Sequence, residues 1–415
     1  MTQALSPETL QQTAQDFPVS ALPVVDQFVL LAGGDLWTAR IADLSARASA
    51  ANRVGGLLKQ RHALEFAIER MRGRDGAGGA PAPSVAEQRL HAILAELVLA
   101  AGSFSAAGRA RLQSRLQDAL QEEGRLVDLL HLFRTAALQQ ARGFTVIYAG
   151  LEQEARYDLL LSRDGAEVEC ICETMSAEAG RDVHRFAWAE LCDRVEGQMK
   201  PWLNARPGRY LLKMTLAAGL RDKEAAMQTQ LHDRVVAMLQ SGARLDQDQD
   251  AVLRIEPLVL SGNNASVENL MGRLRREFGP EAHFSVSACA EGIWAMAARA
   301  GRRNDVAALL RSELSRWALA RVSAERPAIL SIFVEDIDRP EWRGLMDSLE
   351  LEGAARHFMT ADEAGNVVAV TCYSRMEMFG LSGPDAAAEG ELRFRNPAHP
   401  AAKISALAPA ILSSL

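Results

Sequence analysis

The chain has 415 residues, of which 48% are hydrophobic and 24% are charged, so it is long enough for two or three globular domains. Its formal net charge is −7, and because phosphate repels an acidic surface, the overall charge does not favour non-specific nucleic-acid binding. The five cysteines lie at irregular spacings, which excludes a disulfide framework and gives no zinc-finger pattern.

The N-terminal part of the chain, residues 1–120, is predicted to be a helical region. Its apolar residues recur at spacings of three, four and seven, which is the pattern of one helix face. A Gly- and Pro-rich linker near 73–83 interrupts this pattern. The spacing of Ser84 and Glu87 then predicts a capping box at the start of the next helix.

The sequence shows neither a secretory signal nor a membrane span. The first residues are polar, and the longest apolar stretch, residues 93–101, is far shorter than the ~20 residues needed to cross a bilayer. We therefore expect a cytoplasmic protein that has no membrane partner.

Residues 121–262 show helix and strand patterns in an order that is typical of a mixed α/β core. The expected elements are a helix near 125–142, strands at 144–148, 157–162 and 167–172, a helix at 183–203, a strand at 210–216, a helix at 223–239 and a strand at 252–260. Residues 263–415 are predicted to form a C-terminal α/β region, with helices at 267–278 and 304–322 and strands at 283–288, 328–334 and 367–373.

A tight turn at Asp164 and Gly165 joins two of these strands, and Asp-Gly between two β-rich runs is a strong hairpin signal. Counting outward from the turn places directly opposed residues on the same face of the hairpin. One face is apolar and is expected to face the core: Leu159, Leu161, Val168, Cys170 and Cys172. The other face carries Asp158, Leu160, Ser162, Glu167, Glu169, Ile171 and Glu173.

The second face gathers four carboxylates, which repel one another unless their charge is offset. Solvent, basic partners or a divalent cation can offset it, and sets of oxygen ligands suit Mg²⁺ or Mn²⁺. A metal ion held there would activate a water and stabilise a leaving oxygen in phosphodiester hydrolysis. The candidate metal ligands are Asp158, Glu167, Glu169 and Glu173.

The run from Tyr157 to Ser176 resembles the PD-(D/E)XK, or restriction-endonuclease-like, nuclease superfamily, in which an Asp opens the second strand and a (D/E)-x-K motif lies on the third. The preceding helix and strand and the following helix match in order, so the resemblance covers about residues 125–217. It implies a restriction-endonuclease-like mixed-sheet core, DNA as the partner, Mg²⁺ or Mn²⁺ as the cofactor if the site is active, and a setting in bacterial genome processing or defence. The catalytic residues that it suggests are Asp158, Glu169 and Glu173.

The motif lysine is missing in every register. Asp158 matches the family Asp. The hairpin register puts Ile171 at the position of the motif's acidic residue and Glu173 at the position of its lysine. If the motif is aligned two residues earlier, Glu169 takes the position of the acidic residue and Ile171 that of the lysine. A further shift gives an E-x-E arrangement over 167–169, which some restriction enzymes use. Because the lysine orients the attacking water and offsets charge on the phosphate, its loss removes transition-state stabilisation.

Basic residues outside the hairpin provide candidate phosphate contacts. Arg181 and Arg185 stand at the start of the helix after the hairpin, where they can face the carboxylates and bind phosphate; a solvated first turn is the alternative. Two further clusters suit a nucleic-acid footprint, although such clusters are more often solvated helix faces: Arg273, Arg275 and Arg276, and Arg299, Arg302 and Arg303.

These patterns favour a nuclease-superfamily protein that acts on or near nucleic acid with degraded or lost phosphodiesterase activity, in a binding or regulatory role. The first alternative is an active Mg²⁺-dependent DNA endonuclease with an all-carboxylate site. The second is a protein-interaction scaffold whose acidic face docks a basic partner and which has no nucleic-acid role. The sequence leaves open whether the chain binds a protein partner or forms a homo-oligomer.

Overall fold

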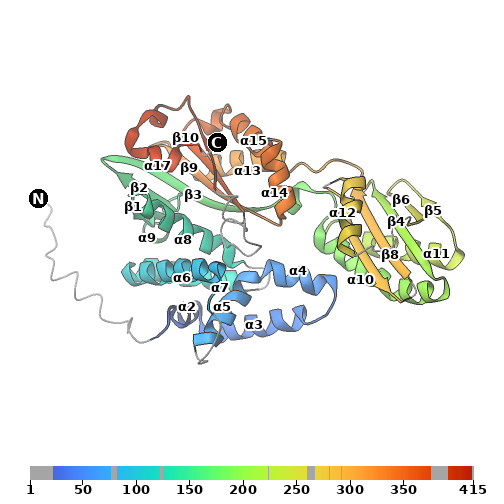
Figure 1. The fold of residues 1–415 in the computed structure, drawn as a ribbon. Coiled ribbons are helices and arrows are strands. Elements are labelled where there is room, and N and C mark those ends of the chain that lie inside the picture. The colour runs from blue at the N-terminus through green and yellow to red at the C-terminus, as the bar shows by residue number, and fades with distance from the viewer. Residues whose placement is uncertain are drawn as a thin grey trace, which may run out of the picture.

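The structure is a computed structural model, and it describes residues 22–75, 82–121, 125–222, 224–258, 267–279, 281–290, 292–374 and 391–413. Most of the linker predicted near 73–83 therefore lies outside the described residues. Two mixed sheets and their flanking helices form a mixed α/β fold, as the sequence predicts (Figure 1). No helix in the described ranges is both long enough and apolar enough to cross a lipid bilayer.

The first sheet has six strands, in the order β1 (Thr145–Ile147), β2 (Leu159–Arg163), β3 (Ala166–Ser176), β9 (Ala328–Glu335), β10 (Val367–Ser374) and β11 (Leu392–Arg395). The central strands β3, β9 and β10 run parallel, and the outer pairs are antiparallel. β9 and β10 are buried along their whole length, as expected for central parallel strands that are covered on both faces.

The hairpin of β2 and β3 forms as predicted. Asp164 and Gly165 have φ angles of 49° and 81°, so both turn residues are left-handed, as a type I′ turn requires. The register pairs Arg163 with Ala166 and continues outward along both strands. It confirms the predicted division of the hairpin side chains between two faces.

Helices cover both faces of the first sheet and create three layers. α8 (Leu126–Ala141) packs on one face, and α13 (Val306–Arg321), α14 (Arg339–Asp347) and α15 (Glu350–Phe358) pack on the other. The apolar core on the α8 side continues into the N-terminal helices below it in Figure 1. These are α2 (Val24–Ala32), α3 (Gly34–Ala48), α5 (Ala63–Asp75), α6 (Val85–Ser103) and α7 (Ala106–Leu120); α4 (Arg53–Arg61) lies between α3 and α5 in the chain.

Several local predictions hold at the level of single elements. Ser84 and Glu87 form the expected capping box at the start of α6. All five cysteines are free thiols, and four of them are buried. The remaining short elements are α9 (Ala149–Glu152), η2 (Ala177–Gly180), η3 (Asp362–Ala364), η5 (Pro400–Lys403), η6 (Ser405–Leu407) and α17 (Ala408–Ile411).

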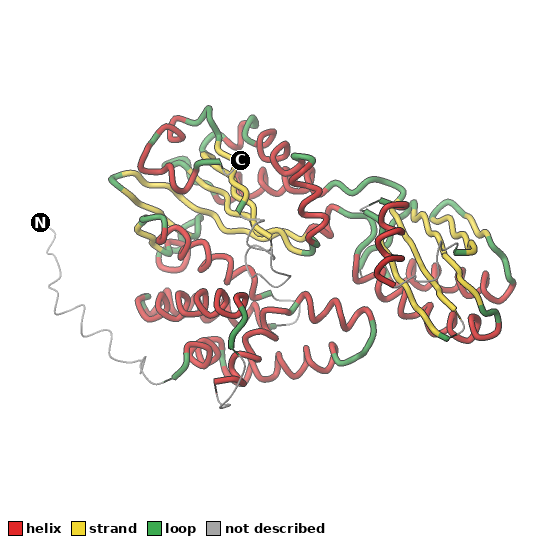
Figure 2. Tube along the Cα trace, in the orientation of Figure 1, coloured by secondary structure: helices red, strands yellow, loops and turns green. Residues whose placement is uncertain are grey.

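A second sheet forms a separate lobe, which is inserted in the chain between β3 and α13 (Figure 2). We call it the second lobe. α10 (Arg185–Ala205) and α11 (Ala225–Ser241) cover one face of its sheet, and α12 (Val267–Phe278) packs on the other. Across the sheet the strands are β5 (Leu245–Gln247), β6 (Ala251–Pro257), β4 (Gly208–Leu216), β8 (Gly292–Ala300) and β7 (His283–Cys289).

The sheets divide the chain differently from the ranges expected from the sequence. The expected core, residues 121–262, joined the hairpin to the strands at 210–216 and 252–260, but β4 and β6 lie in the second sheet. The hairpin pairs instead with β9 and β10, which come from the expected C-terminal region, residues 263–415. The strands that take the central positions beside the hairpin, β9 and β10, are buried along their whole length, as a sheet covered on both faces requires.

Two chain segments connect the second lobe to the first sheet, and they touch at Gly180. We call this contact between residues 177–183 and 301–306 the neck. The N–H of Asp305 donates to the carbonyl of Gly180 at 2.9 Å. A Cβ on Gly180 would lie 2.9 Å from Cα of Val306 and 3.1 Å from the carbonyl oxygen of Asp305. A side chain at Gly180 would therefore force the two segments apart.

Replacing Gly180 with alanine is expected to lower the free energy of unfolding by about 1–3 kcal/mol, because the added methyl group overpacks the neck. Chemical denaturation followed by circular dichroism measures this change. Gly197→Ala is the matched control, since Gly197 lies inside α10 with no atom within 4 Å of the added Cβ. It is expected to be neutral or stabilising by up to about 1 kcal/mol. Equal losses in both variants would contradict the close approach at Gly180.

Candidate functional site

Asp158 lies immediately before β2, where the backbone fixes its carboxylate against β3. Its N–H donates to the carbonyl of Cys170 at 3.1 Å, and its Oδ2 accepts from the N–H of Cys172 at 2.8 Å. The residue is only 3% exposed. Because a buried carboxylate needs further hydrogen bonds or a cation, its other partners decide what this site can do.

The four carboxylates that the sequence assigns to one hairpin face lie along that face in the structure. We call them the acidic row: Asp158, Glu167, Glu169 and Glu173. The opposite face packs in the core on the α8 side, as predicted. The acidic row faces the end of α13 and the residues that follow it, so solvent does not provide most of its partners.

One short segment supplies a partner for every member of the acidic row. We call residues 321–326 the covering segment; it begins with the last residue of α13 and leads to β9. Arg321 bridges two carboxylates at its start. Its Nη2 lies 3.0 Å from Oδ2 of Asp158, and its Nη1 lies 2.5 Å from Oε1 of Glu173.

The rest of the covering segment pairs with the other two members of the acidic row. Ser323 donates to Glu169 twice, through its N–H at 3.1 Å and its Oγ at 2.5 Å. Arg326 follows, with its Nε 2.7 Å from Oε2 of Glu167. From Arg321 to Arg326 along the covering segment, the paired carboxylates on β3 go from Glu173 back to Glu167. The covering segment therefore runs antiparallel to β3 and beside it.

Arg321 carries the positive charge at the buried end of the acidic row. Burial lowers the pKa of Arg321, but Asp158 and Glu173 outweigh burial and hold this pKa above its ordinary value. Burial raises the pKa of the Glu173 carboxyl above its ordinary range, although Arg321 opposes this shift. Arg115 of α7 adds a second cation 3.8 Å from Oδ1 of Asp158. The site is therefore an internal ion-pair cluster.

The acidic row does not fit the Mg²⁺ or Mn²⁺ that the resemblance implies. Among the residues that the structure describes, no group of three or more His, Cys, Asp or Glu side chains is arranged to hold a metal ion. Asp158 and Glu173 direct oxygens at the guanidinium of Arg321, and Glu169 accepts from Ser323. The arrangement supports ion pairing, and no catalytic step follows from it.

Arg181 and Arg185, the predicted phosphate contacts, lie at the neck and face other carboxylates. Arg181 has a side chain only 2% exposed and pairs with Glu178 and Glu341. Burial lowers the pKa of Arg181, but Glu341 and Glu178 outweigh it and raise this pKa. Arg185 pairs with the same two carboxylates, at 3.5 Å and 3.1 Å. Both guanidinium groups are therefore already neutralised, which opposes the predicted phosphate role.

No local pattern in the sequence identifies the covering segment. Glu169 and Ser323 are 154 residues apart, and the whole second lobe separates them in the chain. One indirect signal was available, because a row of carboxylates requires cations and the helix predicted at 304–322 carries Arg321 near its end. No spacing rule selects this arginine from the others.

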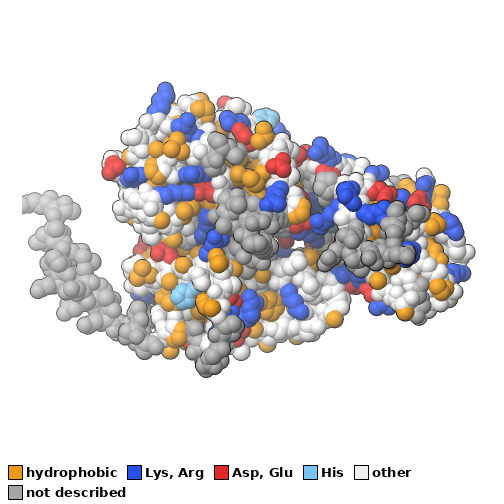
Figure 3. All heavy atoms as spheres, in the orientation of Figure 1, with side chains coloured by type: hydrophobic (Ala, Val, Ile, Leu, Met, Phe, Trp, Pro, Cys, Tyr) orange, Lys and Arg blue, Asp and Glu red, His pale blue; other side chains and the backbone are white. Residues whose placement is uncertain are grey.

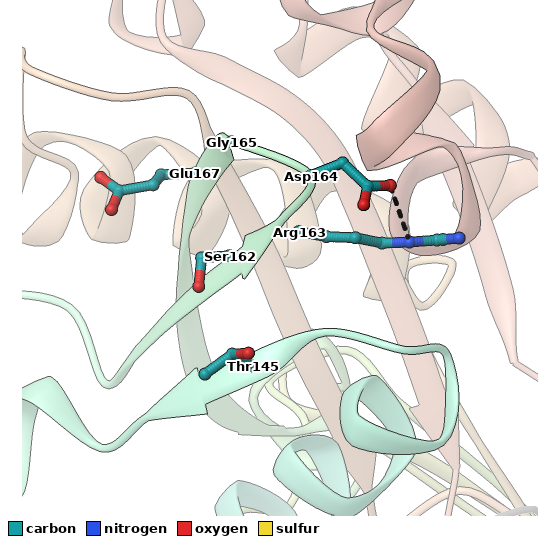
Figure 4. A pocket seen from close by; sticks show the side chains of 6 residues that line it. All are labelled: Thr145, Ser162, Arg163, Asp164, Gly165 and Glu167. Carbon is teal, nitrogen blue, oxygen red and sulfur yellow. Dashed lines mark ion pairs between the residues drawn. The ribbon is translucent and has the colours of Figure 1, made fainter.

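The turn end of the hairpin borders an open hollow of about 480 Å³. Figure 4 shows Asp164 and Glu167 pointing away from each other there. Arg163 lies beside Asp164, with 3.6 Å between Nε and Oδ2. The hollow therefore gathers no convergent set of polar groups, and we do not treat it as the functional site.

Replacing Arg321 with alanine is expected to destabilise the protein strongly, because two carboxylates lose their cation. Breaking a buried ion pair costs about 3–5 kcal/mol, and since the Arg321 side chain is 25% exposed we expect about 2–3 kcal/mol, measured by chemical denaturation. Arg356→Ala is the control, because Arg356 is 59% exposed and pairs with Glu352 on the same helix, α15. Its expected cost is below about 0.5 kcal/mol. A loss at Arg321 as small as that of the control would contradict the bridge.

Comparison of the chain with protein-family models, with curated proteins and with solved structures finds no match.

Proposed function

We propose that this chain is a nuclease-fold protein whose carboxylate site is closed by its own covering segment, and that it binds nucleic acid without cleaving it. The observation that carries the proposal is the position of Arg321 between Asp158 and Glu173. A guanidinium there takes the place that a divalent cation needs for phosphodiester hydrolysis.

The order of elements supports the nuclease-fold part of the proposal. The resemblance requires a helix, three strands, a helix and a further strand. α8, β1, β2 and β3 supply the first four elements, and α13 and β9 supply the last two after the inserted second lobe. Asp158 stands at the entry to the second strand, which is the position of the family Asp.

The chemistry of the acidic row supports the loss of catalysis. An active site of this type needs carboxylate oxygens free for a metal ion, and the motif lysine adds positive charge beside the phosphate. Here Asp158 and Glu173 share one guanidinium, and Glu169 is fully buried with two donors from Ser323. No lysine occurs at any register of the hairpin.

The same contacts argue against the alternative of a scaffold whose acidic face docks a basic partner. A basic partner would need to meet the acidic row, but the covering segment has already taken up its charge. Glu167 is the most open member, with a side chain 45% exposed, and even this carboxylate pairs with Arg326.

The purified protein is expected to leave supercoiled plasmid intact in the presence of Mg²⁺ or Mn²⁺, and to retard it on a gel in a salt-dependent manner. The matched variant is Asp158→Asn, which removes one charge from the acidic row and is expected to leave both results unchanged. Cleavage that disappears in Asp158→Asn would select the active endonuclease instead. An intact plasmid with no retardation at low salt would contradict the nucleic-acid role.

A further inference from the structure

An open pocket of about 400 Å³ lies in the second lobe beside the neck, where β4 and β8 end. Three arginines line it: Arg299 from the end of β8, and Arg302 and Arg303 from the segment that follows. Glu281 also lines the pocket and is the acidic group among its lining residues. Figure 3 shows several Lys and Arg side chains on this side of the second lobe.

These three arginines are exposed and are only weakly paired with carboxylates. Arg299 is exposed and has no ion-pair partner among the residues that the structure describes. The side chain of Arg302 is 82% exposed, and its carboxylate contact is at 3.8 Å. Arg303 is 79% exposed and approaches Glu281 and Glu350 at 3.5 Å and 3.4 Å. Exposed pairs of this length contribute about 0–1 kcal/mol, so an incoming anion can replace them.

Arg181 differs from the pocket arginines in how far its hydrogen-bond donors are already used. Arg181 is buried between two carboxylates and also donates to a backbone carbonyl, so its donors are used within the fold. The pocket arginines line an open space, and their contacts with carboxylates, Arg302 with Asp182 and Arg303 with Glu281 and Glu350, are long, at 3.4–3.8 Å. Their charge and donors are therefore available to a ligand.

Phosphate is the anion that this arrangement suits best. A guanidinium donates two parallel hydrogen bonds to a phosphate, and several guanidinium groups from adjacent positions can contact successive phosphates of one strand. The pocket is open to the surface, and Phe278 at the end of α12 is one of its lining residues and adds an apolar surface. An open groove with arginines and an aromatic side chain is the combination found in proteins that bind single-stranded nucleic acid.

The sheet of the second lobe carries further basic residues on the face beside the pocket. Thr215 of β4 pairs with Arg299 of β8, and two residues earlier Lys213 pairs with Arg254 of β6. These residues share the face that α12 partly covers, since alternate residues of β4 belong to the core on the other face. Arg254 is 56% exposed and lies 3.6 Å from Glu256, which also pairs with Lys213 at 2.8 Å, so this face carries both charges and the pocket itself holds the weakly paired basic groups.

We propose that this pocket binds the phosphate groups of a nucleic-acid strand, with Arg299, Arg302 and Arg303 as the contacts. The inference rests on the proposed function and gives it a location, because it assigns binding to the second lobe and away from the acidic row. It also accounts for binding by a chain whose net charge is −7, since the contact surface is a local one.

The test uses the full chain and short fluorescein-labelled DNA, single-stranded and duplex, with binding followed by fluorescence anisotropy between about 50 and 200 mM salt. The test variant replaces Arg299, Arg302 and Arg303 together with glutamine. The matched control replaces three exposed helix arginines that lie elsewhere, Arg47, Arg316 and Arg356, and so removes the same charge. Circular dichroism and thermal melting confirm that both variants are folded.

The pocket variant is expected to bind at least about tenfold more weakly at low salt, with a slope of log K against log salt reduced by about 2, while the control stays close to the original protein. Equal loss in both variants would reduce the effect to net charge and overturn the pocket. Unchanged binding by the pocket variant would also overturn it but leave the proposed function standing. Failure of the original protein to bind either DNA would overturn both.

Discussion

Burial of charged groups beside the first sheet constrains this sheet and the helices that cover it. Asp158 and Glu169 are almost completely buried, and such carboxylates persist only when donors or cations satisfy them. Arg321 and Ser323 meet this requirement and so tie the end of α13 to the hairpin. The chain then enters β9, and the N–H of Glu169 donates to the carbonyl of Pro327 at 2.9 Å. The same contacts that neutralise the acidic row therefore help to set the register between β3 and β9.

The second lobe interrupts the chain between β3 and α13 without disturbing this arrangement. It leaves and rejoins the first sheet through the neck, and α4 of the N-terminal region holds it at a second place. There Arg53 pairs with Asp193 at 2.9 Å and donates to Ser287 at 2.8 Å. A lobe held at two places keeps its arginine pocket in a defined position relative to the hairpin. Under the proposed function, the first sheet with its helices is a nuclease-type core and the second lobe carries the binding surface.

The local parts of the fold could be predicted from the sequence, because their signals lie within a few residues. Asp164 and Gly165 specify the turn and hence the two faces of the hairpin. The partner of β3 could not be predicted, since strand periodicity reports burial and leaves pairing open. The acidic row was correctly placed on one face, but its partners come from the covering segment, which lies beyond the inserted lobe. Carboxylates gathered by a local pattern predict a need for positive charge; whether a metal ion or an arginine meets it depends on the long-range fold.

Crystals of the protein grown with Mn²⁺ would test the central claim most directly, through the anomalous scattering of the metal. The account predicts no anomalous peak within the acidic row and electron density for the guanidinium of Arg321 between Asp158 and Glu173. A peak coordinated by Asp158 together with Glu169 or Glu173, with Arg321 displaced from both, would contradict it.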